Sequence, residues 1–157
     1  MGLAQQALLQ DAYLELQGNL GAGKTTLVRH LLQALGVTGR IKSPTYAVVE
    51  PHEGFAPASH APLAIWHFDF YRFNDPQEFE EAGFRDLFAS PGLKIAEWPE
   101  QAQGMLPDAD LQIAIEVGEN DMRAVFCKAS TAKGQRILQG LQSALRGTPS
   151  ACAPPCP

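Results

Sequence analysis

The feature that most constrains this chain is the stretch Gly18–Thr25, which matches the phosphate-binding loop pattern G-x-x-x-x-G-K-[ST] in full. Its glycines let the backbone bend so that successive N–H groups point at phosphate oxygens. Lys24 can then reach the β- and γ-phosphates of a nucleotide, and the Thr25 hydroxyl can join the coordination shell of Mg²⁺. The stretch therefore predicts a nucleotide site.

This pattern requires a strand before it and a helix after it. Residues 12–17 can form a short strand, although Glu15 and Gln17 are unusual in a strand buried on both faces. After the loop, apolar residues recur at helical spacing until Gly36, a natural helix stop: Leu27, Val28, Leu31, Leu32 and Leu35. Because both flanks fit, a chance glycine loop is the weaker interpretation.

The composition describes a globular chain. Its 157 residues predict one domain, residues 1–147, followed by a disordered Pro- and Cys-containing tail at 148–157. No apolar run is long enough to cross a bilayer and no secretory signal is visible, which predicts a cytoplasmic protein without membrane contact. The net charge of −5 argues against a protein that grips nucleic acid by itself. Cys127 is expected to be a small core residue, and Cys152 and Cys156 are weak evidence for a metal site or disulfide.

Two apolar strands are predicted to end in a carboxylate. Residues 63–68 run into Asp69, and residues 93–97 end in Glu97. Folds of the α/β class place catalytic groups at such strand ends. Asp69 could bind Mg²⁺ or position a water, with an ion pair to Arg72 as the structural alternative, and Glu97 could hold the Mg²⁺ hydration shell. His67 is expected to be a packed strand residue rather than a base.

The remaining segments complete an α/β pattern. Residues 43–46 form either a plain loop or a loop that senses the γ-phosphate. Residues 47–50 predict a strand and 51–62 a surface loop. Asp75 can cap a helix that runs to about Phe88, with inward-facing residues Phe79, Ala82 and Leu87. An antiparallel hairpin is expected over 111–129, followed by a last helix after Ser130 or Thr131. We therefore expect a P-loop NTPase-like three-layer sandwich, with a mostly parallel, mixed central sheet and a C-terminal antiparallel hairpin.

Four motifs in this order and spacing resemble the TsaE family, whose older name is YjeE: residues 18–26, 43–46, 68–72 and 97–99. The resemblance extends from about Tyr13 to Arg146. It implies an Mg²⁺-dependent ATPase required for making N6-threonylcarbamoyladenosine in tRNA. It also implies two partner proteins, TsaB and TsaD, through whose complex the tRNA is reached indirectly. ATP hydrolysis is thought to reset or license that complex between turnovers.

The resemblance also implies residue roles. The ATP phosphates would be bound by Gly21, Ala22, Gly23, Lys24, Thr25 and Thr26. Thr25 and Glu97 would serve Mg²⁺, and Asp69 would be the acid most directly tied to hydrolysis, with Glu97 and Lys24 also catalytic. Ser43 and Thr45 would lie near the γ-phosphate, and Trp98 near the nucleotide.

The chain departs from the family pattern in three places. Family members usually carry a longer segment before the phosphate loop than the seventeen residues here, including an extra strand and helix. Either an edge of the sheet and part of the adenine pocket lack their counterparts, or the true start of the protein lies upstream. Asn19 stands where Asp is common, which keeps the hydrogen-bonding shape but removes a charge. The Pro- and Cys-containing tail has no recognised counterpart.

Two other functions fit the loop. A small-molecule kinase shares the loop and the size but needs a basic lid, and no Arg-rich segment follows Glu97. A nucleotide-binding assembly module that never turns over would not need carboxylates at two strand ends. No free arginine finger is evident, so turnover of the isolated chain should be slow; Arg72 is one candidate in cis, and a partner could supply another.

Overall fold

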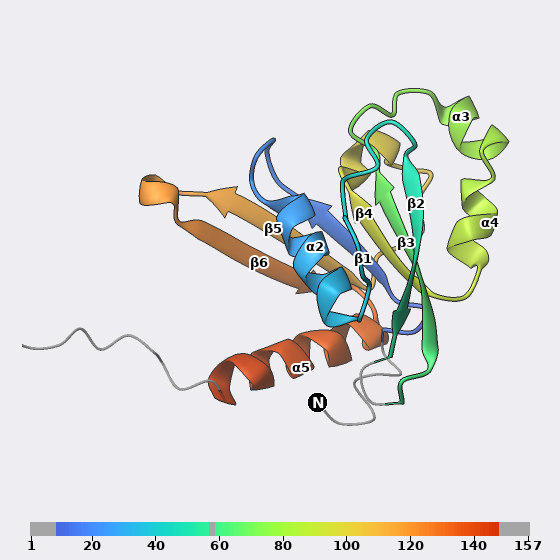
Figure 1. Ribbon diagram of the computed structural model, residues 1–157. Helices are drawn as coiled ribbons and strands as arrows, with labels where there is room; N and C mark the ends of the chain where they lie inside the picture. Colours follow the sequence, from blue (N-terminus) through green and yellow to red (C-terminus); the bar gives the residue numbers. More distant parts are fainter. Residues whose placement is uncertain (1–8, 57–58, 148–157) are drawn as a thin grey trace, which may run out of the picture.

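The computed structural model describes residues 9–56 and 59–147 (Figure 1). The strands are β1 (Tyr13–Gln17), β2 (Val49–Phe55), β3 (Pro62–Asp69), β4 (Leu93–Glu97), β5 (Leu111–Val117) and β6 (Arg123–Ala129). The helices are α2 (Lys24–Ala34), α3 (Pro76–Glu81), α4 (Phe84–Ala89) and α5 (Ala132–Gly147), with short 3₁₀ turns η1 (Pro99–Ala102) and η2 (Glu119–Asp121). None of these helices combines the length and apolar character needed to span a membrane.

The strands form one mixed sheet in the order β2-β3-β4-β1-β5-β6. The four inner strands run parallel, whereas β2 and β6 pair antiparallel at the two edges. In this register Glu97 lies opposite both Leu16 and Asp69. The carboxyl ends of β1, β3 and β4 therefore meet at one edge of the sheet, where α/β folds place their ligands.

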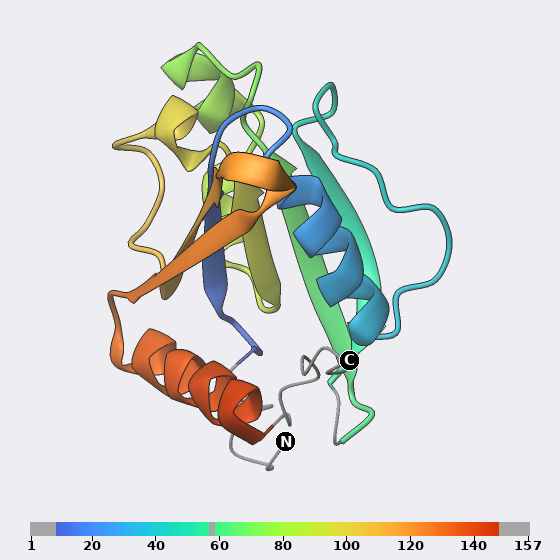
Figure 2. The ribbon, with the colours of Figure 1, turned by 90° about the vertical axis from the view of Figure 1, so that its left-hand side faces the viewer.

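Helices cover both faces of the sheet, which confirms the predicted three-layer arrangement (Figure 1). One face packs an aliphatic core against α2, with Val28, Leu32 and Leu35 at the interface, and Ile137 and Leu138 of α5 extend it. The other face carries an aromatic core in which α3 and α4 contribute Phe79 and Phe84. Figure 2 shows α5 at the end of the sheet away from the loop that precedes α2.

The helix predicted from Asp75 to Phe88 is instead two short helices. Its beginning is confirmed, because the Asp75 carboxylate accepts the Gln77 backbone N–H at 2.9 Å. The chain then turns at Gly83, whose φ of 70° ends α3 and starts α4. This turn brings both Phe79 and Phe84 into the aromatic core, whereas Ala82, expected to face inward, is exposed.

Two further predictions were wrong. The surface loop expected over 51–62 is shorter than predicted, because β2 continues to Phe55 and β3 begins at Pro62. Pro51 is tolerated there since β2 is an edge strand, where a missing N–H costs no ladder bond. Cys127, expected in the core, is exposed on β6, since this edge strand carries exposed side chains on both faces. The tail at 148–157, with Cys152 and Cys156, lies outside the described residues.

The unusual Glu15 is accommodated by two neutral donors. It is buried in β1, and its carboxylate accepts the Tyr13 hydroxyl and the Gln112 side-chain amide, both at 3.0 Å. Burial, followed by the nearby Glu15 charge and this hydrogen bond, raises the pKa of the Tyr13 hydroxyl well above its ordinary value. A polar residue thus occupies a doubly covered strand without leaving a buried acceptor unpaired.

Gly134, an unfavourable residue inside a helix, is explained in α5 by a close approach between chain segments. A Cβ at this position would lie 1.7 Å from the Asp110 carbonyl oxygen. The Thr131 hydroxyl accepts the Gly134 N–H at 3.0 Å and donates to the Asp110 carboxylate. The start of α5 is therefore fastened to the segment before β5, and only glycine fits at the contact.

Candidate nucleotide site

A cavity of about 280 Å³ opens at the carboxyl edge of the sheet, beside the phosphate loop. Every site residue predicted from the sequence lines it except Ala22, whose side chain is buried beneath the loop. Leu20 and Tyr71 complete the wall. The structure therefore brings four separate sequence motifs together at one cavity.

The loop that enters this cavity has the conformation that its glycines were expected to allow. Gly18, Gly21 and Gly23 have φ values of +145°, +79° and +106°, in the region that side chains disfavour. Helix α2 begins at Lys24, so its unpaired N–H groups and the positive end of its dipole face the cavity. This geometry is the one that backbone anion binding requires.

Lys24 is turned back onto its own loop. Its ammonium donates to the carbonyl oxygens of Gly18 at 2.6 Å and Asn19 at 3.0 Å, and it lies 3.8 Å from the centre of the Trp98 ring. Burial lowers the pKa of Lys24, and the nearby carboxylates of Glu97, Glu100 and Asp69 oppose that shift. To reach a phosphate, Lys24 must exchange these carbonyl contacts for phosphate oxygens.

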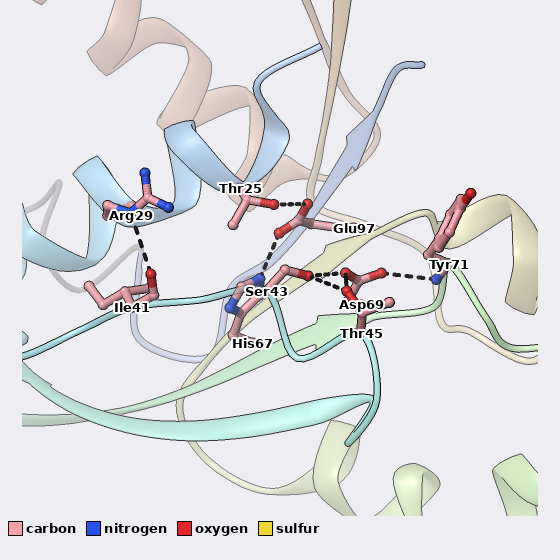
Figure 3. A network of polar contacts seen from close by, with 9 residues as sticks. All are labelled: Thr25, Arg29, Ile41, Ser43, Thr45, His67, Asp69, Tyr71 and Glu97. Carbon is pink, nitrogen blue, oxygen red and sulfur yellow. Dashed lines mark hydrogen bonds and ion pairs between the residues drawn. The ribbon is translucent and has the colours of Figure 1, made fainter. Parts of the chain in front are cut away.

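Thr25 and Glu97 form the centre of the polar network drawn in Figure 3. The Thr25 hydroxyl donates to the Glu97 Oε2 at 2.8 Å, although the two residues lie 72 positions apart in the chain. The second oxygen, Oε1, lies 2.8 Å from Nε2 of His67, and both residues are almost fully buried. The carboxylate is therefore held at both oxygens, beside the first turn of α2.

Asp69 is held equally firmly, by the loop at 43–46. Its Oδ2 accepts the Ser43 and Thr45 hydroxyls, the latter at 3.0 Å, and its Oδ1 accepts the Tyr71 N–H at 2.9 Å (Figure 3). Asp69 does not form the alternative ion pair with Arg72. The Arg72 guanidinium instead packs over Tyr46, 4.4 Å from the centre of its ring. The 43–46 loop is thus attached to an acidic group of the cavity.

The donor set suits Mg²⁺ and a phosphorylated ligand. Hydroxyl and carboxylate oxygens are the ligands that Mg²⁺ prefers, and it usually keeps few protein ligands, with waters and phosphate oxygens in the rest of its shell. Over the described ranges no group of three or more His, Cys, Asp or Glu side chains could hold a metal by itself. Thr25 and Glu97 therefore fit a cation that arrives with a nucleotide.

Two contacts at the site escaped the sequence analysis. His67 is packed in β3 as expected, yet its ring also contacts Glu97. The sequence could have predicted this, because His67 lies two residues before Asp69 and alternate residues of a strand lie on the same face of the sheet. Arg123, at the start of β6, donates from Nε to the Ala22 carbonyl oxygen at 3.1 Å. No local sequence pattern predicts this contact of Arg123, because β6 is brought near the phosphate loop by the tertiary arrangement, in which the sheet order is β1-β5-β6.

The fold and this cavity define a P-loop NTPase-like α/β protein. Residues 2–125 match the family model described as "Threonylcarbamoyl adenosine biosynthesis protein TsaE". The chain belongs to the TsaE family, which confirms the resemblance stated from its motifs.

Individual relatives agree with this assignment. The chain is 41% identical over 128 residues to the tRNA threonylcarbamoyladenosine biosynthesis protein TsaE of Haemophilus influenzae, covering 82% of this chain and 77% of that protein. The Bacillus subtilis protein of the same name is 35% identical over 123 residues, covering 78% and 71%. The crystal structure of YdiB from Bacillus subtilis superposes with a TM-score of 0.64 at 23% identity, covering 90% and 88% of the two chains. At that identity the superposition supports the fold alone.

Proposed function

We propose that this chain is an Mg²⁺-dependent ATPase that acts in tRNA N6-threonylcarbamoyladenosine biosynthesis together with TsaB- and TsaD-like partners. Membership of the TsaE family and the names of the relatives support the pathway. The observation that carries the ATPase proposal is the hydrogen bond between Thr25 and Glu97. It joins the last residue of the phosphate loop to the acid at the end of the neighbouring strand β4, where the Mg²⁺ of a nucleotide is held in P-loop NTPases.

Each residue then has a separate task. Thr25 and Glu97 would hold Mg²⁺, which when bound neutralises charge on the β- and γ-phosphate oxygens. Lys24 leaves the carbonyl oxygens of its loop and donates to phosphate, while the N–H groups of residues 21–26 line the phosphate chain. Stabilisation of charge by groups already in place supplies most of the catalysis, and no covalent intermediate is needed.

Asp69 orients the attacking water. Its carboxylate lines the cavity, and its two oxygens are fixed by the Ser43 and Thr45 hydroxyls and the Tyr71 N–H. A fixed acceptor can hold a water in line with the bond to be cleaved. Ser43 and Thr45 couple the 43–46 loop to this acid, so a γ-phosphate that attracts either hydroxyl would alter the contacts of Asp69.

Turnover of the isolated chain should be slow. Within the described part of the chain no arginine lines the cavity, since Arg72 packs on Tyr46 and Arg123 donates to the loop backbone. A partner that supplies a cation or repositions Arg72 would accelerate the reaction. The TsaB–TsaD complex is the candidate partner.

The test is Mg-ATP turnover by the purified chain, alone and with the TsaB- and TsaD-like proteins. We expect slow turnover that rises with the partners and falls about 10²- to 10⁴-fold in Asp69→Asn. Asp86→Asn, an exposed carboxylate on α4, is the matched control and should leave turnover unchanged. Turnover that ignores the partners but needs an added nucleoside acceptor would identify a kinase. Tight ATP binding without turnover in any mixture would identify an assembly module.

A further inference from the structure

His67 is a buried polar residue with a single polar contact in the part of the chain that the structure describes. Its side chain is fully buried in β3, and its Nε2 lies 2.8 Å from the Glu97 Oε1. Its other ring nitrogen, Nδ1, is buried and has no hydrogen-bond partner among the described residues. A buried imidazole with one unpaired nitrogen costs stability, so the contact that it does make calls for a functional explanation.

The hydrogen-bond pattern around Glu97 defines the direction of this contact. The Thr25 hydroxyl already donates to Oε2, and a carboxylate can only accept. Nε2 of His67 must then carry the proton, which leaves Nδ1 as a bare acceptor. The opposite tautomer would place an unpaired N–H in the core and would face a carboxylate with a lone pair.

The two anchors of Glu97 are not equivalent once a cation is bound. The Thr25 hydroxyl lines the cavity and is the group expected to turn toward Mg²⁺, whereas His67 lies behind the carboxylate in the sheet. When the hydroxyl turns away, His67 is the remaining hydrogen-bond donor to Glu97 among the described contacts. The pair also spans β3 and β4, the two strands that carry Asp69 and Glu97.

We propose that His67 is a positioning residue, which holds the Glu97 carboxylate toward the cation site through its Nε2–H while Thr25 exchanges its contact. This inference rests on the proposed function, because it concerns the same Mg²⁺ site. Residues that orient a metal-bound carboxylate typically change metal affinity by roughly 10- to 100-fold when removed. His67 therefore acts on the metal through Glu97 and should leave metal-free nucleotide binding largely unchanged.

The experiment measures Mn²⁺, a paramagnetic substitute for Mg²⁺, by the loss of its free EPR signal in the presence of ADP. We compare the wild type with His67→Leu, which removes the donor, and His67→Gln, whose amide nitrogen can replace Nε2. Ile65→Val, at another buried position of β3, controls for lost stability without touching Glu97. Affinity for ADP without metal is measured on every variant.

We expect His67→Leu to weaken Mn²⁺ binding about 10- to 100-fold, with metal-free ADP affinity unchanged and most of the loss recovered in His67→Gln. Ile65→Val should lower the melting temperature but leave Mn²⁺ affinity alone. Wild-type Mn²⁺ affinity in His67→Leu would overturn this inference and leave the proposed function standing. A wild type that binds no Mn²⁺ with ADP would overturn both.

A second measurement does not depend on any variant folding. Nitrogen-15 NMR of the histidine side chains in the wild type, without nucleotide, reports which nitrogen of His67 carries the proton. We expect the Nε2–H form. The Nδ1–H form would overturn the inference, since His67 could not then donate to Glu97.

Discussion

The first glycine of the phosphate loop offers the most direct test of how the site is supported. A Cβ at Gly18 would lie 2.5 Å from the Ile115 carbonyl oxygen and 3.2 Å from the Ala22 Cβ, at a φ of +145°. At Gly21, in the same loop, the φ is +79° but a Cβ would meet no atom of the residues at 9–56 and 59–147 within 4 Å. The pair Gly18→Ala and Gly21→Ala therefore separates backbone strain from the contact with β5.

The expected losses in the free energy of unfolding follow from the backbone strain and from the contact with β5. An alanine in the left-handed region costs about 1–2 kcal/mol, partly offset by the smaller entropy of the unfolded chain, so Gly21→Ala should cost about 1 kcal/mol. Gly18→Ala carries a comparable strain and also overpacks the loop against the main chain of β5, which adds about 1–3 kcal/mol. We expect a total of about 2–4 kcal/mol at Gly18.

The assay is equilibrium unfolding in urea, followed by far-UV circular dichroism on the wild type and both variants. The free energy of unfolding should fall distinctly further for Gly18→Ala than for Gly21→Ala, with similar m-values for all three proteins. Equal losses in the two variants would refute the reasoning, because they would mean that the approach of Gly18 to Ile115 does not constrain the loop.

Two further predictions concern the pH dependence of stability and the hairpin. Burial raises the pKa of the Tyr13 hydroxyl, so as the pH rises the unfolded chain loses this proton at a lower pH than the folded chain does. Above about pH 10 the free energy of unfolding of the wild type should therefore fall, relative to Tyr13→Phe, by up to about 1.4 kcal/mol per pH unit. Urea midpoints between pH 9 and 11 test this, and parallel curves would contradict it. Arg123→Ala removes the hydrogen bond to Ala22, worth about 0.5–1.5 kcal/mol, and should weaken Mg-ADP binding several-fold by calorimetry. Arg136→Ala, on α5, should leave the affinity for Mg-ADP unchanged. Equal affinities in the two variants would argue against a role for the β5–β6 hairpin in nucleotide binding.

Much of the site could be predicted because its residues belong to local patterns. The strand, loop and helix around Gly18–Lys24 follow from glycine conformations and helical periodicity, which act over a few residues. Asp69 and Glu97 were found because an apolar run that ends in an acid is visible within six or seven residues. The helix break at Gly83 and the extension of β2 past Pro51 were missed, because packing and edge position overrode the local signals.

The sequence by itself thus determined the class of fold, the loop and the acids at the strand ends, since each depends on neighbouring residues. Only the tertiary structure decided which of these groups meet. The order β3-β4-β1 brings Thr25 to Glu97 and sets His67 behind it, and the packing of the 43–46 loop carries Ser43 to Asp69. These contacts span 24 to 72 residues of chain, and they form because burying the sheet fixes the register of its strands.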